Sequence, residues 1–469
     1  MFKFSAIFLI FYLKTVIPAD TSWCSTDTFV KEKCLCNTFT NENTNFPASM
    51  ANCAGLSINK FPSFLDLPDD INVLDLSMNN IEILESSSES SSHTLKQLVL
   101  SYNIIKDISE DFFNGLPGLT WLDLSHNNLS SLYGSSDSNI FLQQKNLIYL
   151  DLSFNNFKQL PGGVFYPLAM LKSLDLSYNP LGEFLSQSKD ILYRTLGTSL
   201  NLTRLSLNNL QLNDLHPDYF TSYQDLKELE LQDNYFNYIP TVPYSVEFLD
   251  LSGNNISFIA ARYLNYHSLK SLRLSRMPSL TSIHHYAFYN LQSLESLTIT
   301  DCPNLKEFTE LAFGLASKVM DIHPIKLNLA RNSITTLNST YVHMFRQMKQ
   351  VDLRHNPWQC DCNILWLQEF GTELFKSREI RCASPKNLAN KRVLDLTEAD
   401  WTECYPHIYG KTSHKITIVV LMGAVIFLTG LIFYLIKYPK FWVSPQDLGI
   451  NIGPNSPYSE APQEDNRIG

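Results

Sequence analysis

One leucine template recurs along most of this chain and constrains its fold more than any other feature. The template has the form L-x-x-L-x-L-x-x-N-x-L, and Leu119, Leu122, Leu124, Asn127 and Leu129 make one complete copy. The fourth position of the template recurs at Leu74, Leu98, Leu122, Leu150, Leu174, Leu205, Leu229, Leu249, Leu272, Leu297, Leu327 and Val351. Most intervals lie near a period of roughly 24 residues. The sequence therefore predicts about twelve repeats over residues 71–355.

The spacing inside each repeat predicts a short strand. In the x-x-L-x-L segment the leucines should point inward and the residues between them outward. No single repeat can bury its own leucine row, so the repeats must stack side by side. We expect an α/β fold, a solenoid whose parallel strands form a curved, horseshoe-shaped sheet. The repeats lengthen around residues 134–138, 183–198 and 307–323, which predicts either local kinks or insertion-built binding sites.

The asparagine of the template predicts a ladder of buried amides along the solenoid. Such side chains satisfy backbone groups inside the turns. The ladder should comprise Asn79, Asn103, Asn127, Asn155, Asn179, Asn234 and Asn254. Cys302 falls at the same template position, which predicts a buried residue rather than an intermolecular bridge. Leu210 and Met277 replace the asparagine in two other repeats.

The remaining cysteines form two clusters, one on each side of the repeats. The first contains Cys24, Cys34, Cys36 and Cys53, and the second contains Cys360, Cys362, Cys382 and Cys404. Such grouping is typical of disulfide-stapled modules in an oxidising compartment. Zinc is the alternative because Cys-x-Cys pairs can bind metal, but no second close-spaced pair completes such a site. We therefore expect disulfide caps at residues 20–70 and 356–410, with the pairing within each cluster left open by the spacing.

Residues 24–404 resemble the extracellular leucine-rich-repeat family, whose repeats end in cysteine-rich caps. The C-terminal module carries the resemblance in Asn356-Pro357-Trp358-x-Cys360-x-Cys362, followed by Trp366-Leu367, Cys382 and Cys404. The resemblance implies the pairs Cys24–Cys36, Cys34–Cys53, Cys360–Cys382 and Cys362–Cys404. The repeats, caps and membrane span are also similar to those of Toll-like receptors. We expect no folded cytoplasmic signalling domain here, which argues against direct signalling of the Toll type.

Both ends of the chain predict a membrane topology. Within residues 1–19, Lys3 is followed by an apolar run from Phe4 to Leu13 that is too short to cross a bilayer, which predicts a cleaved secretory signal rather than a buried N-terminal strand. Residues 416–436 contain no charged side chain and are long enough for one transmembrane helix. The proline-spaced residues 437–469 would be a short disordered cytoplasmic tail, in which Tyr458 is a candidate phosphorylation site. The expected location is the plasma membrane, with the N-terminus outside.

Two kinds of surface residue are candidate functional positions. Glycosylation sequons occur on the extracellular side of the expected topology, at Asn128, Asn201, Asn255 and Asn338. Aromatic side chains recur at outward-facing strand positions of the early repeats, at Tyr102, Trp121, His126, Tyr149, Phe154 and Tyr178. Aromatic residues at adjacent exposed positions could anchor a protein partner, although they also tile such sheets without a dedicated ligand. Later repeats bring Arg273, Arg276, Arg331, Arg354 and His355 to comparable positions, which predicts a basic end of the same face.

Recognition, rather than catalysis, is the function that these patterns favour. The chain contains neither a glycine-rich phosphate loop nor a nucleophile elbow, and His284-His285 lack matching carboxylates or cysteines. We therefore expect no enzyme, no cofactor and no metal, and the net charge of -10 argues against nucleic acid as a partner. The expected function is a cell-surface recognition or adhesion receptor for an extracellular protein. A co-receptor or decoy for Toll-like receptors and a shed binding module are the alternatives, and homo- or hetero-oligomers remain open.

Overall fold

The structure is a computed structural model in which two compact units are distinguished, residues 1–400 and 401–469. It describes residues 24–25, 33–40, 47–62, 70–86, 91–133, 139–314, 325–375, 377, 379–401, 404 and 410–437. The expected signal peptide, the tail with Tyr458 and the lengthened segment at 134–138 lie outside the described residues.

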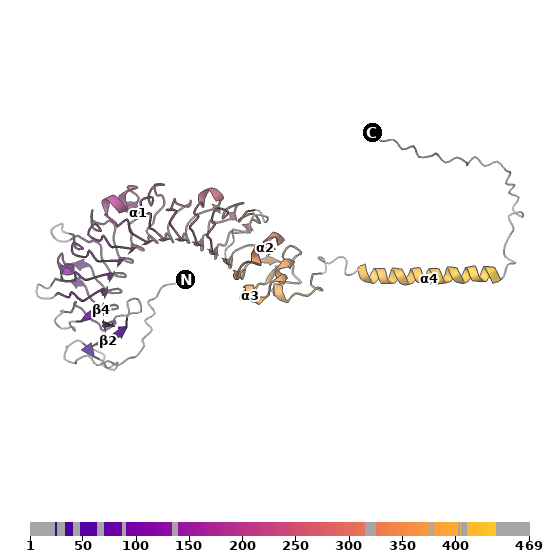
Figure 1. Ribbon diagram of the computed structural model, residues 1–469, viewed down its shortest axis with the longest axis horizontal. Coiled ribbons are helices and arrows are strands. Elements are labelled where there is room, and N and C mark those ends of the chain that lie inside the picture. The colour runs from indigo at the N-terminus through magenta and orange to yellow at the C-terminus, as the bar shows by residue number, and fades with distance from the viewer. Residues whose placement is uncertain are drawn as a thin grey trace, which may run out of the picture. The chain divides into compact units, whose positions relative to one another are not determined.

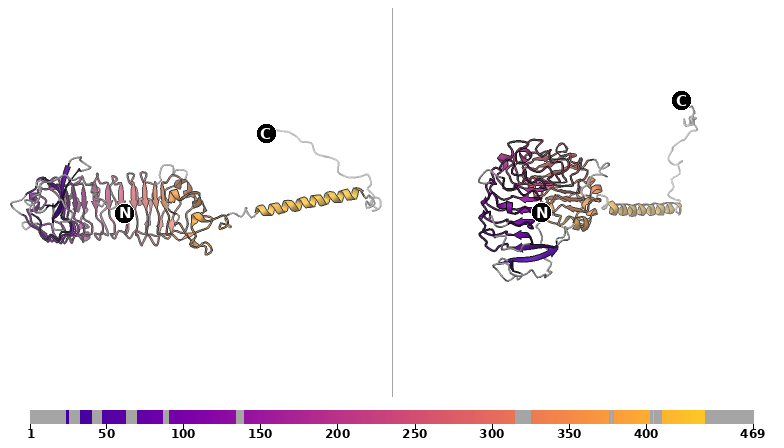
Figure 2. Two further views of the ribbon diagram at one scale, coloured as in Figure 1. Left: turned by 90° about the horizontal axis from the view of Figure 1, so that it is seen from below. Right: turned by 60° about the vertical axis from the view of Figure 1, so that its left-hand side comes forward.

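The first unit is an arc of stacked repeats with one long parallel sheet along its inner side (Figure 1). Figure 2 shows the short strands lying side by side along the solenoid. The sheet contains, in spatial order, β1 (Cys24–Ser25), β2 (Cys34–Thr40), β3 (Pro47–Asn52), β4 (Ile71–Asp75), β6 (Gln97–Val99), β8 (Trp121–Asp123), β9 (Tyr149–Asp151), β10 (Ser173–Asp175), β11 (Arg204–Ser206), β12 (Glu228–Glu230), β13 (Phe248–Asp250), β15 (Ser271–Arg273), β17 (Ser296–Thr298), β19 (Lys326–Asn328) and β20 (Gln350–Asp352). Only the β2–β3 pair is antiparallel among these strands.

The register of the sheet follows the leucine template. Each repeat places its template residue directly opposite the next one, from Leu74 on β4 to Val351 on β20. Their exposed fractions are 0–1 %, so every repeat buries its leucines against its two neighbours. Burying one such side chain contributes roughly 1.5–3 kcal/mol. The predicted solenoid is confirmed, and neighbouring repeats rather than single repeats supply the core.

Smaller elements cover the outer side and the end of the arc. Two further parallel sheets are formed by β5 (Ile83–Leu84) with β7 (Asp107–Ile108), and by β14 (Phe258–Ile259), β16 (Ser282–Ile283) and β18 (Glu307–Phe308). The short helices are α1 (Gly182–Leu185), α2 (Val342–Phe345) and α3 (Thr372–Phe375). The lengthened repeat at 183–198 contains α1 and one π-helical turn, Ile191–Thr195.

The asparagine ladder has the predicted role. Asn127 shows the arrangement: its Oδ1 accepts the N–H of Ile105, and its Nδ2 donates to the carbonyls of Leu100, Leu124 and Ser125. Cys302 takes the same place and donates through Sγ to two carbonyl oxygens at 3.4 Å. It is buried and free of any disulfide, and burial raises the pKa of its thiol to about 11.

The two cysteine-rich ends carry disulfides. Cys34–Cys53 joins β2 to the residue after β3, and Cys360–Cys382 joins the two-stranded sheet of β21 (Trp358–Gln359) and β22 (Cys382–Ser384). These two predicted pairs are confirmed. Cys36, Cys362 and Cys404 are disulfide-bonded as well. The pairs Cys24–Cys36 and Cys362–Cys404 remain predictions.

The described residues of the second unit include one helix, α4 (Gly410–Lys437). Its apolar side chains from Val420 to Phe433 are exposed. Within the described ranges, no helix combines the length and the apolar character that a membrane crossing requires.

Candidate functional site

Two groups of aromatic rings lie on the open face of the sheet in the early repeats. The aromatic pair consists of Trp121 on β8 and Tyr149 on β9, whose ring centroids are 3.5 Å apart with an interplanar angle of 8°. The aromatic row consists of Tyr102, His126, Phe154 and Tyr178, whose successive centroids are 3.9–4.0 Å apart. The structure therefore brings together all six aromatic residues that the sequence indicated.

The aromatic row does not lie on the strands, contrary to the sequence-based expectation. β8 ends at Asp123, three residues before His126, and the other members of the row likewise follow their strands. All four residues have left-handed backbone conformations, with φ between 52° and 58°. An L-residue rarely adopts this conformation, so each ring is held in a fixed turn beside the asparagine ladder. Only Trp121 and Tyr149 occupy strand positions.

Three of these rings are exposed and the other three, those of His126, Tyr149 and Tyr178, are half-buried. Tyr102 is 50 % exposed, Phe154 39 % and Trp121 38 %. Because parallel repeats hold equivalent side chains one strand spacing apart, neighbouring rings stack face to face along the solenoid. The stacked rings form two apolar strips along the solenoid, and uncovered apolar surface of this kind is a feature of protein interaction sites.

A row of three carboxylates lies between the aromatic pair and the aromatic row. Asp123, Asp151 and Asp175 occupy the third residue of β8, β9 and β10 and are directly opposite one another in register. Each Oδ1 accepts the backbone N–H of the serine two residues later, at 2.8–2.9 Å. The Tyr149 hydroxyl donates to Asp151 at 3.1 Å. We name these three aspartates the carboxylate row.

Burial, and then the crowding of negative charge, raises the pKa values of groups in this row. Burial, and then the charge of Asp151, raises the pKa of Asp175 to about 7. Burial and the charge of Asp123 raise the pKa of Asp151 as well. Burial raises the pKa of the Tyr149 hydroxyl, and all three carboxylates add to that increase. The row therefore places mutually repelling carboxyl groups beside the aromatic rings.

Replacing Asp175 by asparagine is expected to stabilise the protein at neutral pH. The folded-state pKa is raised, so between pH 4 and 7 the unfolded chain ionises first and stability falls as pH rises. Asp175→Asn removes this effect and also the repulsion from Asp151, for a gain of roughly 1 kcal/mol at pH 8 that disappears near pH 4. Urea unfolding of the full-length chain at pH 4, 6 and 8 measures the difference. Asp301→Asn is the matched control: Arg331 lowers the pKa of Asp301, so this substitution should destabilise at pH 8. A gain at pH 8 that persists at pH 4 would contradict the assignment.

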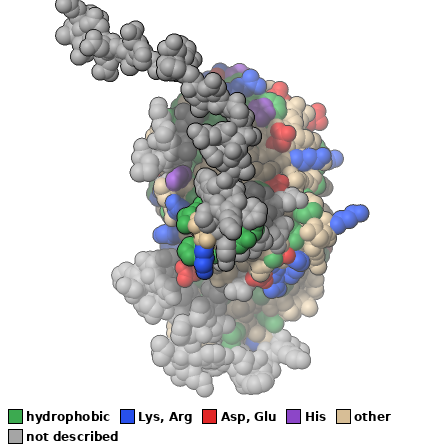
Figure 3. Space-filling model, turned by 90° about the vertical axis from the view of Figure 1, so that its right-hand side faces the viewer, with side chains coloured by type: hydrophobic (Ala, Val, Ile, Leu, Met, Phe, Trp, Pro, Cys, Tyr) green, Lys and Arg blue, Asp and Glu red, His purple; other side chains and the backbone are tan. Residues whose placement is uncertain are grey.

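The later repeats do not form the basic surface that the sequence suggested. Arg273 lies 3.8 Å from Asp250, and Arg331 binds Asp301 through two hydrogen bonds. Arg354 pairs with Asp352 in the same manner. Figure 3 shows positive and negative side chains scattered together over one face of the molecule. The arginines are neutralised by neighbouring aspartates, which the sequence pattern alone did not indicate.

A fourth ion pair, between Arg276 and Asp233, spans a repeat and requires a glycine. Arg276 donates to both carboxylate oxygens of Asp233, at 2.7 and 3.1 Å, from two repeats further along the chain. Gly253 occupies the equivalent turn of the repeat between them, with φ of 76°. A Cβ at Gly253 would lie 2.0 Å from Asp233 Oδ1. Glycine is therefore required at this position both for the left-handed turn and for the space that the ion pair occupies.

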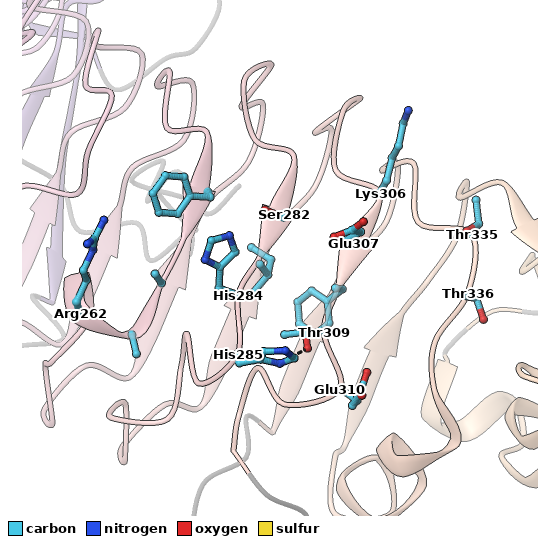
Figure 4. A pocket seen from close by; sticks show the side chains of 15 residues that line it. Arg262, Ser282, His284, His285, Lys306, Glu307, Thr309, Glu310, Thr335 and Thr336 are labelled. Carbon is cyan, nitrogen blue, oxygen red and sulfur yellow. Dashed lines mark hydrogen bonds between the residues drawn. The ribbon is translucent and has the colours of Figure 1, made fainter.

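A hollow of about 1000 Å³ lies along the sheet of β14, β16 and β18 (Figure 4). His284 stacks on Phe258, and His285 Nδ1 lies 2.7 Å from Thr309 Oγ1. Glu307 and Glu310 line the same hollow. Within the described part of the chain, no group of three histidine, cysteine or acidic side chains is arranged to hold a metal ion.

The four sequon asparagines are exposed. Asn128 and Asn255 follow directly after the ladder residues Asn127 and Asn254, while Asn338 caps a short turn by accepting the N–H of Thr340. Their glycosylation remains a prediction. Asn128 is two residues from His126, so a glycan there would stand beside the aromatic row.

Comparisons with known proteins agree with this architecture. A leucine-rich-repeat model matches residues 69–129 and 130–181, and a BspA-type leucine-rich-repeat region matches residues 242–356. Tsukushi of Gallus gallus is 28 % identical over 66 % of this chain and 74 % of its own length. The CD180 antigen of Mus musculus is 26 % identical over 73 % of this chain, which spans half of that relative's length. An internalin of Listeria monocytogenes aligns with a TM-score of 0.41 at 19 % identity, over 61 % of this chain and 76 % of that one.

Proposed function

We propose that this chain, a leucine-rich-repeat protein of the extracellular class with a Toll-like-receptor type of ectodomain, binds an extracellular protein through the open face of β6 to β10. The observation that carries the proposal is the set of six exposed or half-exposed aromatic rings, stacked in two groups on either side of the carboxylate row. The disulfide bonds and the similarity to Tsukushi and the CD180 antigen support this class of function.

Several properties of this surface support protein recognition. Aromatic side chains are enriched among the residues that dominate binding energy, because they bury a large area with little loss of side-chain entropy. The rings are already held by stacking and by fixed turns, so a partner would not have to order them. The surface contains no arrangement of nucleophile and base, so an enzymatic role is not part of the proposal. Binding of nucleic acid is not part of the proposal either, because the carboxylate row would repel phosphate.

The proposed location is the plasma membrane, with residues 1–19 as a cleaved signal and residues 416–436 as a single span. The sequence 416–436 has no charged residue, and α4 continues without a break across it. Asn128, Asn201, Asn255 and Asn338 would then carry glycans outside the cell. Protease protection of tagged termini in intact cells tests this topology. Access of external protease to a C-terminal tag would contradict it.

We call the aromatic pair and the aromatic row together the aromatic surface. Loss of partner binding in a variant of this surface tests the proposed function. The full-length chain is displayed on cells and used to capture extracellular proteins. The affinity of each captured protein is then measured for the unchanged chain and for the Trp121→Ala and Phe154→Ala variants. Each variant should weaken binding by at least about tenfold, since truncation of a central aromatic anchor typically costs about 2 kcal/mol. Tyr235→Ala and Tyr244→Ala are the matched controls, because these tyrosines are 57 % and 68 % exposed outside the aromatic surface. Equal effects of all four substitutions would refute the assignment.

A co-receptor or decoy for Toll-like receptors is the second candidate, favoured by the similarity to the CD180 antigen. Co-precipitation of the full-length chain with each Toll-like receptor of the same cell distinguishes it from an adhesion receptor, for which cells expressing the chain should aggregate. A shed binding module would instead appear in the medium without α4.

A further inference from the structure

In the stacked aromatic pair, Trp121 covers only one ring face of the half-buried Tyr149. Trp121 covers the face that is directed toward β8, and the two ring centroids are only 3.5 Å apart. The opposite face must therefore be directed toward β10, where the register partner of Tyr149 is Ser173. A serine side chain is too short to cover a phenol ring. We define the Tyr149 socket as the surface formed by this ring face, Ser173, Asp151 and Asp175.

The socket contains negative charge without a positive partner. Asp151 and Asp175 lie opposite each other on β9 and β10, and each uses Oδ1 to accept a backbone N–H. Among the described residues, no lysine or arginine nitrogen lies within 4.0 Å of either carboxylate. The paired aspartates of the later repeats differ in this respect, because arginines of the same chain neutralise them.

The next strand does not supply the missing cation. Arg204 on β11 is the register partner of Ser173, but its guanidinium binds Glu228 at 3.0 Å and Glu230 at 2.7 Å on β12. It is therefore engaged on the side away from the socket. Two adjacent half-buried carboxylates disfavour each other's ionisation, and a cation placed between them would remove that penalty.

We propose that the Tyr149 socket receives an arginine side chain of the extracellular partner. Its guanidinium would stack on the free face of Tyr149 and donate hydrogen bonds to Asp151 and Asp175. Arginine fits better than lysine because its planar group can stack on a ring and bind carboxylates in the same plane. The inference rests on the proposed function and specifies the chemistry of the partner at this point of the aromatic surface.

Binding of an arginine-containing probe to the immobilised full-length chain tests the socket. The probe is a peptide of repeated Gly-Ser-Arg units at about 0.15 M salt, which screens long-range attraction to the acidic chain. Its control carries citrulline, the uncharged isostere, in place of each arginine. We expect the citrulline peptide to bind at least about tenfold more weakly, and the lysine version to bind more weakly than the arginine version.

Three variants separate the socket from general charge attraction. Ser173→Leu fills the space in front of Tyr149, and Asp175→Asn removes one carboxylate; each should weaken binding by at least about fivefold. Asp225→Asn removes the same charge from an exposed position elsewhere and should leave binding within about twofold. Asp175→Asn is expected to stabilise the fold, so loss of binding there cannot arise from unfolding.

Each remaining outcome overturns the socket. No binding of the arginine peptide, or equal losses for Asp175→Asn and Asp225→Asn, would mean that no specific arginine site exists. A captured partner that loses affinity in Trp121→Ala but binds Ser173→Leu normally would refute the socket while leaving the proposed function intact. Failure to capture any partner through the aromatic surface would refute the proposed function itself.

Discussion

Asn179→Ala is expected to lower the free energy of unfolding by about 3–5 kcal/mol, because one buried amide satisfies several backbone groups at once. Asn179 Oδ1 accepts the N–H of Phe157, and Nδ2 donates to the carbonyls of Leu152, Leu176 and Ser177 at 2.9–3.3 Å. Alanine leaves these groups without that partner in a region where water cannot replace it. Urea unfolding of the full-length chain measures the loss.

Two matched variants test the explanation. Asn179→Cys should lower the free energy of unfolding less than Asn179→Ala does, because Cys302 shows that a thiol at this position of the repeat can donate to two carbonyls. Asn114→Ala should change stability by less than about 0.5 kcal/mol, because this exposed asparagine bonds only an exposed aspartate side chain. If Asn179→Ala and Asn114→Ala had similar effects, the ladder would not be a principal source of stability.

The position of Asn179 in the middle of the solenoid amplifies the effect. Each repeat is stabilised mainly through the interfaces with its two neighbours, so weakening one interface disconnects the repeats on either side. Hydrogen exchange should therefore increase most in the repeats that contain β9 and β10 and less toward the two ends.

The register of the sheet could be predicted because a single template fixes it. Once Leu122, Leu150 and Leu174 are assigned to the same inward position, the outward residues of neighbouring strands must also face one another. Sequence reasoning thereby placed Trp121 beside Tyr149 and the members of the aromatic row side by side. The stacking found in the structure is the direct consequence of that periodicity.

The contacts that could not be predicted from the sequence depend on side-chain conformation rather than on the periodicity of the repeats. Arg276 reaches Asp233 past Gly253, a pairing across 43 residues that no repeat spacing indicates. The same holds for Glu307 and Glu310, which the fold places in the hollow of His284 and His285. Long charged side chains can reach several neighbours, and the choice among them is made by local packing.

The left-handed turns explain why the aromatic row differs from the aromatic pair. A strand residue such as Trp121 is placed by the pleat alone, whereas His126 follows the strand and is placed by a turn with positive φ. The backbone N–H of His126 donates to the carbonyl of Ser153 in the next repeat, which helps to hold that turn. The template pattern includes no residue type that marks this conformation, so sequence reasoning assigned both groups to the strands.

Trp358→Ala is expected to destabilise the protein by about 3–5 kcal/mol, the range for removing a buried aromatic side chain. Trp358 on β21 has an exposed fraction of 0 %, and its Nε1 donates to the carbonyl of Leu353 at 3.0 Å. It is also the register partner of Cys382, which forms the disulfide with Cys360. The tryptophan therefore connects the last strand of the repeats to the disulfide-bonded cap, and its removal exposes the apolar end that the cap protects.

Trp121→Ala is the matched control for this prediction, since the same side chain is removed from a position that is 38 % exposed. Denaturant unfolding followed by circular dichroism should show a loss of roughly 1 kcal/mol or less for Trp121→Ala and the full loss for Trp358→Ala. Hydrogen exchange should increase in residues 350–384 of the Trp358 variant before it increases in the early repeats. Comparable losses for the two variants would mean that Trp358 has no capping role. Trp358 must be buried whereas Trp121 can be exposed, because a capped solenoid must bury its ends but can leave its open face uncovered for a partner.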